Sequence, residues 1–387
     1  MDLAERATIL TPSLTLSIDS KAKEMKAGGI DVCGFGAGEP DMDTPDHIKA
    51  AAQASIESGF TKYTPSSGIP ELRQAIADKL LADNKVEYKA SQVIVSNGAK
   101  HSCFNAVLAT CDPGDEVIIP APYWLSYPEM VRLAGGTPVF VETREENGWK
   151  MTAEEFESAM TPRTKMVILN SPNNPTGAVY TREELEALVE VAEGEDIIIL
   201  SDEIYEKLVY DGVEHVSVAS LSKEAYDLTI TVNGFSKCYA MTGWRLGYLA
   251  APEPLAKAID AIQSHSTSNP CSFSQKGGLA ALKGDQTPVE DMRAEFDLRR
   301  HYMVNRLKGI DRVRVVEPKG AFYALANISE LGLTSTNFAD RLLSKHHVAV
   351  VPGIAFGNDG TIRFSYATSL DIIKTGLDRF EEFCRTL

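Results

Sequence analysis

Apolar runs rich in β-branched residues recur through the chain, and helical segments separate most of them. The runs lie at 93–97, 116–120, 137–143, 165–170, 196–203, 228–234 and 246–252. Runs of this kind, bounded by glycine and proline, are typical of a mostly parallel sheet that is covered by helices on both faces. The pattern therefore predicts an α/β fold with a large sheet of about seven strands.

The spacing of apolar residues between and around these runs predicts the helices. Thr181 and Glu184 have the spacing of a capping box, which predicts a helix that starts directly after Thr181. Further helices are expected at about 16–26, 46–59, 70–82, 99–109, 122–135, 152–160, 254–264, 272–283 and 288–308.

The C-terminal part of the chain has a different pattern. Four short segments alternate in strand fashion, at 312–318, 321–328, 348–352 and 361–367, and helices are expected at 336–345 and 369–386. This arrangement predicts a small α+β domain, and we expect the N-terminal segment to pack against it.

The length of the chain agrees with two domains. It has 387 residues, of which 44% are hydrophobic, and single cores stop growing at roughly 250–300 residues. We expect residues 1–45 to form an N-terminal arm and part of the small domain, 46–285 to form the large domain, and 286–387 to form the small C-terminal domain.

Charge and cysteine content exclude several classes of function. The net charge of −16 gives no basic surface for nucleic acid or for an anionic membrane. The six cysteines are scattered without metal-ligand spacing, so we interpret them as reduced thiols of a cytoplasmic protein and expect no metal. The N-terminal segment has no apolar stretch long enough for a signal peptide or a membrane span.

The segment 233–248 contains the most distinctive candidate chemistry. Lys237 is flanked by Phe235, Cys238 and Tyr239, and partial burial there would lower the pKa of its amine and make it a nucleophile able to form a Schiff base. Arg245 offers a guanidinium that can hold a phosphate. Together they suggest pyridoxal phosphate; the alternative is a lysine at the edge of the core and a salt-bridged arginine.

Other candidate residues follow the ends of predicted strands, where ligands collect in such sheets. The segment 96–100 leads from strand to helix and could cradle a phosphate. Asp202 ends an apolar run and needs a cationic partner, such as a pyridinium nitrogen, unless it caps a helix. Tyr205 and Asn174 could bond a ring oxygen, and Trp124 could stack on the ring or belong to the core.

Arg363 lies inside a predicted strand, between Ile362 and Phe364. Alternation places it on the opposite face from these two apolar residues. It is therefore a candidate for binding a substrate carboxylate through two parallel hydrogen bonds, with a structural salt bridge as the alternative.

In this order, the motifs GAGEP, KYTPSSGIPELR, SNGAK, PYW, NSPNNPTG, SDEIY, NGFSK, GWRLGY and RFSYA resemble those of the class I aminotransferases of the fold-type I pyridoxal-phosphate enzymes. The resemblance runs from about Pro12 to the last helix. The most similar subgroup is that of the bacterial aspartate aminotransferases, which includes aspartate/prephenate aminotransferases.

The resemblance implies a role for each matching residue. Lys237 would carry pyridoxal 5'-phosphate as an internal aldimine, Asp202 would pair with the pyridinium, Tyr205 and Asn174 would bond the phenolic oxygen, and Trp124 would stack on the ring. The phosphate would be held by Gly98, Ala99, Ser236 and Arg245, at the start of the helix that contains Lys100, with Tyr63 supplied by the second subunit of a homodimer. Arg363, Asn174 and the backbone of Gly38 would bind the substrate α-carboxylate, beside Trp124.

The implied reaction moves an amino group between L-aspartate or L-glutamate and 2-oxo acids by a ping-pong mechanism. The segment 264–270 contains no arginine that could bind the distal carboxylate. The resemblance assigns that task to Lys100, with Ser13 and Thr15 from the N-terminal arm. A single ammonium selects a distal carboxylate less strictly than a guanidinium does, so aromatic amino acids and prephenate are further candidate substrates.

Four other functions are weighed against this one. An aromatic aminotransferase or a β-lyase would keep the cofactor and the fold, because a fold does not determine the reaction. A transcriptional sensor would need a basic DNA-binding module, which this chain lacks. A nucleotide-binding domain is disfavoured because Pro40 and Pro45 follow the glycines at 34–38 where a helix would have to start.

Overall fold

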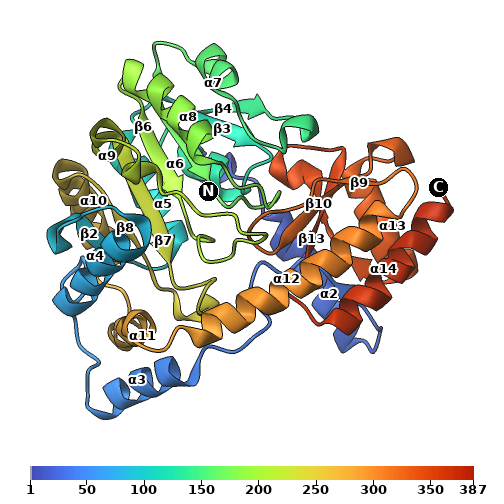
Figure 1. The fold of residues 1–387 in the computed structure, drawn as a ribbon, viewed down its shortest axis with the longest axis horizontal. Helices are drawn as coiled ribbons and strands as arrows, with labels where there is room; N and C mark the ends of the chain where they lie inside the picture. Colours follow the sequence, from blue (N-terminus) through green and yellow to red (C-terminus); the bar gives the residue numbers. More distant parts are fainter. Residues whose placement is uncertain (1) are drawn as a thin grey trace.

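The computed structural model describes residues 2–387. A seven-stranded sheet and the helices that cover it form the larger unit (Figure 1). The strand order is β2-β8-β7-β6-β5-β3-β4, and only β8 runs antiparallel to its neighbours. This confirms the predicted, mostly parallel sheet. Its strands are β2 (Val93–Ser96), β3 (Glu116–Ala121), β4 (Thr137–Glu142), β5 (Thr164–Asn170), β6 (Ile198–Asp202), β7 (Thr229–Gly234) and β8 (Gly247–Ala250).

Successive strand residues point to opposite faces of this sheet, and helices bury both faces. In β3, Val117 and Ile119 pack with α5, α6 and α10, whereas Ile118 packs with α7 and α8. On the side of Ile118, α4 and α11 cover the β2–β8 end of the sheet. The helices are α4 (Pro70–Asn84), α5 (Ala99–Thr110), α6 (Ser126–Leu133), α7 (Ala153–Ala159), α8 (Arg182–Gly194), α10 (Glu253–Ser266) and α11 (Ser272–Lys283).

Two details of the helices bear on the predictions. The capping box of α8 is confirmed, since the Glu184 amide donates to Thr181 Oγ1 and the Thr181 amide donates to the Glu184 carboxylate. The helix expected over 122–135 is shorter than predicted and begins at Ser126. The segment before it is held by another interaction, because the Tyr123 amide donates to the Phe356 carbonyl.

A smaller α+β unit confirms the expected second pattern, and it includes the N-terminal segment (Figure 1). An antiparallel sheet has the order β12-β13-β10-β9, and β1 pairs with β11, so chain segments more than 300 residues apart in sequence lie side by side. Its elements are α2 (Leu14–Ala27), β1 (Cys33–Gly34), β9 (Arg314–Val315), β10 (Tyr323–Asn327), α13 (Ser335–His346), β11 (Val348–Ala349), β12 (Val351–Pro352), β13 (Thr361–Ser365) and α14 (Leu370–Arg385).

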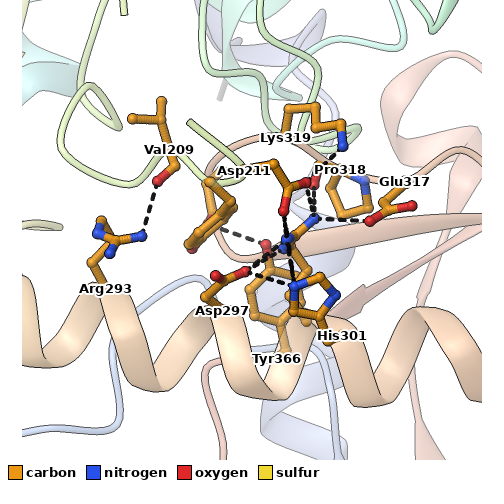
Figure 2. A network of polar contacts seen from close by, with 12 residues as sticks. Val209, Asp211, Arg293, Asp297, His301, Glu317, Pro318, Lys319 and Tyr366 are labelled. Atoms are coloured by element: carbon orange, nitrogen blue, oxygen red, sulfur yellow. Dashed lines mark hydrogen bonds and ion pairs between the residues drawn. The ribbon is translucent and has the colours of Figure 1, made fainter. Parts of the chain in front are cut away.

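The long helix α12 (Thr287–Lys308) runs between the two units and carries a buried ion network (Figures 1 and 2). Arg300 is fully buried, and its guanidinium forms ion pairs with Asp211, Asp297 and Glu317. It also donates a hydrogen bond to the Pro318 carbonyl. Asp211 lies between β6 and β7 of the large sheet and Glu317 precedes β10, so the Arg300 side chain joins both units to the helix. Removing a buried cation from such a network leaves carboxylates without compensation.

The remaining helices are α1 (Glu5–Thr8), α3 (Asp46–Glu57) and α9 (Lys223–Leu228), of which the short α1 and α9 were not predicted. All six cysteines, each within the described residues, are free thiols. Between residues 2 and 387 there is no helix with the length and apolar character needed to cross a membrane.

Candidate active site

Polar side chains from distant parts of the chain converge on one cavity of about 470 Å³. It lies at the carboxyl ends of β5, β6 and β7, where parallel strands leave their backbone groups for ligands. Most of the residues predicted from the sequence line it, and these are Thr15, Gly38, Ala99, Lys100, Trp124, Asn174, Asp202, Tyr205, Ser236, Lys237, Arg245 and Arg363.

Lys237 follows the end of β7 and points its amine into this cavity. Its Nζ donates a hydrogen bond to the Gly38 carbonyl, and within residues 2–387 no carboxylate forms an ion pair with it. Burial lowers the pKa of Lys237 to about 8, and the nearby charge of Arg363 adds to the effect. The neutral fraction of the amine near physiological pH is therefore larger than that of an exposed lysine, and a nucleophile or a proton acceptor requires the neutral form.

Asp202 ends β6 and is 3% exposed. Tyr127 donates to its Oδ2 at 2.7 Å and the Ile204 amide donates to its Oδ1 at 3.2 Å. Burial raises the pKa of Asp202 to about 6, against the opposing effect of these hydrogen bonds. The residues after Asp202 form turns, so the alternative of a helix N-cap is wrong, and the carboxylate stays available for a cation in the cavity.

Arg363 on β13 is buried, and no described carboxylate pairs with it. Its Nη1 donates to Asn174 Oδ1 and its Nη2 donates to the Gly36 carbonyl, both at 2.9 Å. Nε is also buried and lacks a hydrogen-bond partner. A buried guanidinium without a counter-charge favours an anionic ligand over the alternative of a structural salt bridge.

Arg245 lies beside the first turn of α5. It adopts a left-handed backbone conformation with φ of 50°, and its Nη1 donates to the Thr242 carbonyl at 2.8 Å. Gly98 allows this approach, because a Cβ at that position would lie 2.6 Å from Arg245 Nη2. The amide groups of a helix's first turn have no partners within the helix, so the start of α5, Ser236 and Arg245 together can hold an anion.

Two further predicted residues, Lys100 and Trp124, line the same cavity. The amine of Lys100 lies 4.9 Å from the centre of the Trp124 ring, within the range of a cation–π contact. Burial lowers the pKa of Lys100, and the charge of Arg245 lowers it further. Trp124 packs edge-on against Tyr127 and is only partly buried, so its ring is open to the cavity as well as to the core.

Three residues of the prediction lie outside the cavity lining. Tyr63 is 93% exposed and does not line the cavity of its own chain. Ser13 exchanges a hydrogen bond of 2.9 Å with Thr15, which does line the cavity. Gly98 also falls outside the lining but lies against Arg245.

The fold brings to the site four residues that were not among the predicted site residues. Tyr127 binds Asp202, Asn170 donates to the Asp202 carbonyl and accepts from the Asn174 amide, and Tyr323 contacts Tyr205. Glu39 accepts from Thr242 at 2.7 Å. Two of them could have been found from the sequence, since Asn170 ends a predicted strand and Glu39 belongs to the motif GAGEP. The two tyrosines resemble ordinary core residues.

Two clusters elsewhere have side chains of the metal-binding kind. One consists of Glu203, Glu206 and His215, and the other of Asp211, Asp297 and His301. Protein cations already contact both, since Lys79 pairs with Glu206 and Arg300 pairs with the two aspartates. Neither cluster therefore indicates a metal site.

Comparison with known proteins identifies relatives over the full length. The family model described as aminotransferase class I and II matches residues 30–380. The chain is 50% identical to the aspartate aminotransferase of Bacillus sp. strain YM-2, with 99% of each covered, and 48% identical to the aspartate/prephenate aminotransferase of Cereibacter sphaeroides, with 100% of this chain and 99% of that one covered. The structure of Thermus thermophilus aspartate aminotransferase with maleate superposes with a TM-score of 0.95 at 44% identity, covering 99% of both chains.

The contact between Tyr127 and Asp202 yields a prediction about pH. Folding raises the pKa of Asp202 from 3.8 to about 6, so in the protein freed of small molecules its contribution to stability is complete below pH 4 and is lost as the pH rises through about 6. Tyr127→Phe removes a donor to the charged form and raises this pKa further. At pH 8 we expect the variant to be less stable than the wild type by about 1.5–3 kcal/mol, and at pH 4 by less.

Urea unfolding at several pH values between 4 and 8 measures this difference. Tyr226→Phe, which removes a hydroxyl outside the cavity, is the matched control and should show no comparable pH dependence. An equal loss of stability at pH 4 and pH 8 in Tyr127→Phe would show that the hydroxyl does not act on the charged form of Asp202.

Proposed function

Because this chain belongs to the class I and II aminotransferases, we propose that it uses pyridoxal 5'-phosphate to move an amino group between L-aspartate or L-glutamate and 2-oxo acids. The observation that carries this proposal is the composition of the cavity. It combines an amine with a lowered pKa, a buried carboxylate, and two guanidinium groups, Arg245 and Arg363, that no described carboxylate neutralises.

The residues of the cavity fit this coenzyme. Asp202 is a buried carboxylate without a cationic partner among the described residues, and a protonated pyridine nitrogen would supply one. The start of α5, with Gly98 and Ala99, and Arg245 would hold the phosphate together with Ser236. Tyr205 and Asn174 would bond the phenolic oxygen, and Trp124 would cover one face of the ring.

The bound coenzyme supplies an aldehyde that captures amines and an electron-withdrawing ring. Lys237 Nζ, as a neutral amine, accepts the proton from the α-carbon of the amino acid. Asp202 keeps the ring nitrogen protonated, which its buried negative charge favours. Arg363 binds the α-carboxylate with Asn174 and the backbone at Gly38, and so orients the α-hydrogen toward Lys237.

Recognition of the second carboxylate of aspartate is assigned to Lys100, with Thr15 and Ser13 from the N-terminal arm. The position of Lys100 in the cavity lining and over Trp124 supports this assignment. The relative from Cereibacter sphaeroides is named an aspartate/prephenate aminotransferase, and prephenate is for that reason the second candidate substrate.

We also propose that the enzyme is a homodimer in which Tyr63 reaches the phosphate of the neighbouring subunit. Tyr63 is 93% exposed in this chain, which leaves its ring and hydroxyl free to contact a second subunit. The free thiols further support a reducing compartment, the cytoplasm, and the net charge of −16 does not favour nucleic acid as a partner.

The first prediction of this proposal concerns Lys237. We expect Lys237→Ala to abolish turnover with aspartate and 2-oxoglutarate and to remove the visible absorbance of the lysine-bound coenzyme, because the proposal assigns both the covalent link to the coenzyme and the proton transfer to Nζ. Lys207→Ala, which removes a lysine paired with Asp83 outside the cavity, should change neither. Visible spectra and steady-state kinetics measure both effects; a Lys237→Ala protein with normal absorbance and turnover would refute the assignment.

A second prediction concerns Lys100. Replacement by alanine removes one charge-assisted contact to the distal carboxylate, worth about 1.5–3 kcal/mol, so kcat/KM for aspartate should fall by about 10- to 100-fold. The kcat/KM for phenylalanine, which has no distal carboxylate, should change much less. Equal losses for both substrates would mean that Lys100 acts on the coenzyme or the fold instead.

A third prediction tests the dimer. Tyr63→Phe removes a hydrogen bond to a phosphate and should raise the dissociation constant of the coenzyme by about tenfold, for a contact of about 1.5 kcal/mol. Tyr302→Phe, another change of tyrosine to phenylalanine outside the cavity, is the control. Equilibrium dialysis and sedimentation measure retention and assembly; a fully active monomer would contradict the dimer.

A further inference from the structure

Tyr323 begins β10 and lines the cavity, with its side chain fully buried. Its hydroxyl lies 3.0 Å from the hydroxyl of Tyr205. The same hydroxyl is close to Gly38, because a Cβ added there would lie 3.4 Å from it. The phenol therefore occupies the space between two residues that the proposed function assigns to coenzyme and substrate.

The ring of Tyr323 has a second contact. The guanidinium of Arg363 lies over its face at 4.4 Å from the ring centre, and 5.0 Å from the ring centre of Phe356. Hydrogen bonds to Asn174 and to the Gly36 carbonyl hold Nη1 and Nη2. These bonds hold the edge of the guanidinium, and the aromatic rings against it restrict rotation of its plane about the line through the two bonds.

The hydrogen bond between the hydroxyls of Tyr205 and Tyr323 has a defined donor once the coenzyme is bound. Each phenol has one proton, and the proposed role of Tyr205 uses its proton on the phenolic oxygen of the coenzyme. The bond between the two tyrosines must then use the proton of Tyr323. A hydroxyl that accepts a hydrogen bond becomes a stronger donor in its own bond, so Tyr323 strengthens the contact that Tyr205 makes.

We propose that Tyr323 is a positioning residue with two separable roles: its hydroxyl directs the proton of Tyr205 toward the coenzyme, and its ring orients Arg363 toward the substrate carboxylate. The inference rests on the proposed function. A residue that only fills the core, by contrast, would tolerate Tyr323→Phe without any effect on coenzyme or ligand, because the ring and its packing are retained.

The experiment uses the holoenzyme and two measurements that do not depend on turnover. The first is the pH midpoint of the change in visible absorbance of the bound coenzyme. The second is the dissociation constant of maleate, a dicarboxylate without an amino group, at a fixed pH. Tyr226→Phe lies outside the cavity and is the matched control, for which both values should equal those of the wild type.

In Tyr323→Phe we expect the midpoint to move up by about 0.5–1 pH unit, because a weaker donor at the phenolic oxygen lets that oxygen keep its proton more tightly. Maleate should bind within twofold of the wild type, since the ring remains below Arg363. In Tyr323→Leu the midpoint should move in the same way, and maleate should bind about fivefold more weakly.

If Tyr323→Leu does not fold, Tyr323→Met, which also lacks a ring, replaces it in the maleate measurement. An unchanged midpoint in Tyr323→Phe overturns the role of the hydroxyl, and unchanged maleate binding in the ring-free variant overturns the role of the ring. A wild-type protein without any visible absorbance would instead refute the proposed function, so the two failures are distinguishable.

Discussion

The structure depends on charges that are buried around one cavity and kept apart from one another. Asp202 lies at the end of β6, where burial raises its pKa to about 6 and Tyr127 and the Ile204 amide partly offset the cost. Arg363 lies on the opposite unit, also buried and without a carboxylate partner in the described chain. Isolated buried charges are unfavourable, so the site is complementary to a ligand that brings a cation to one end and an anion to the other.

The geometry of these charges requires that the two units meet at a fixed place. Gly177 and Gly320 provide it, since a Cβ at Gly177 would lie 2.3 Å from Pro318 and one at Gly320 would lie 2.5 Å from Pro172. Backbone amides 319 and 320 both donate to the Gly177 carbonyl. The turn that holds Asn174 is thereby pressed against the segment that precedes β10, and Asn174 is brought within hydrogen-bond distance of Arg363.

The regular elements and the family motifs could be predicted from the sequence, because both are local: seven apolar runs became the seven strands, and Thr181 with Glu184 capped α8 as expected. Contacts between remote residues could not. The pairing of β1 with β11 involves two residues on each side, too few to leave a pattern. Tyr127 and Tyr323 are buried aromatic residues, and only their positions beside Asp202 and Arg363 distinguish them from the core.

Under the proposed function, the charge of Arg363 also connects substrate binding to the chemistry at Lys237. After burial, it is the largest cause of the lowered pKa of the Lys237 amine. An anion bound to Arg363 offsets that positive charge, and the pKa of Lys237 then rises toward its ordinary value. The amine is therefore a weaker base while Arg363 has no anion beside it, and a stronger base once a carboxylate is in place. Under the proposed function, one guanidinium therefore both binds the substrate and adjusts the basicity of the lysine.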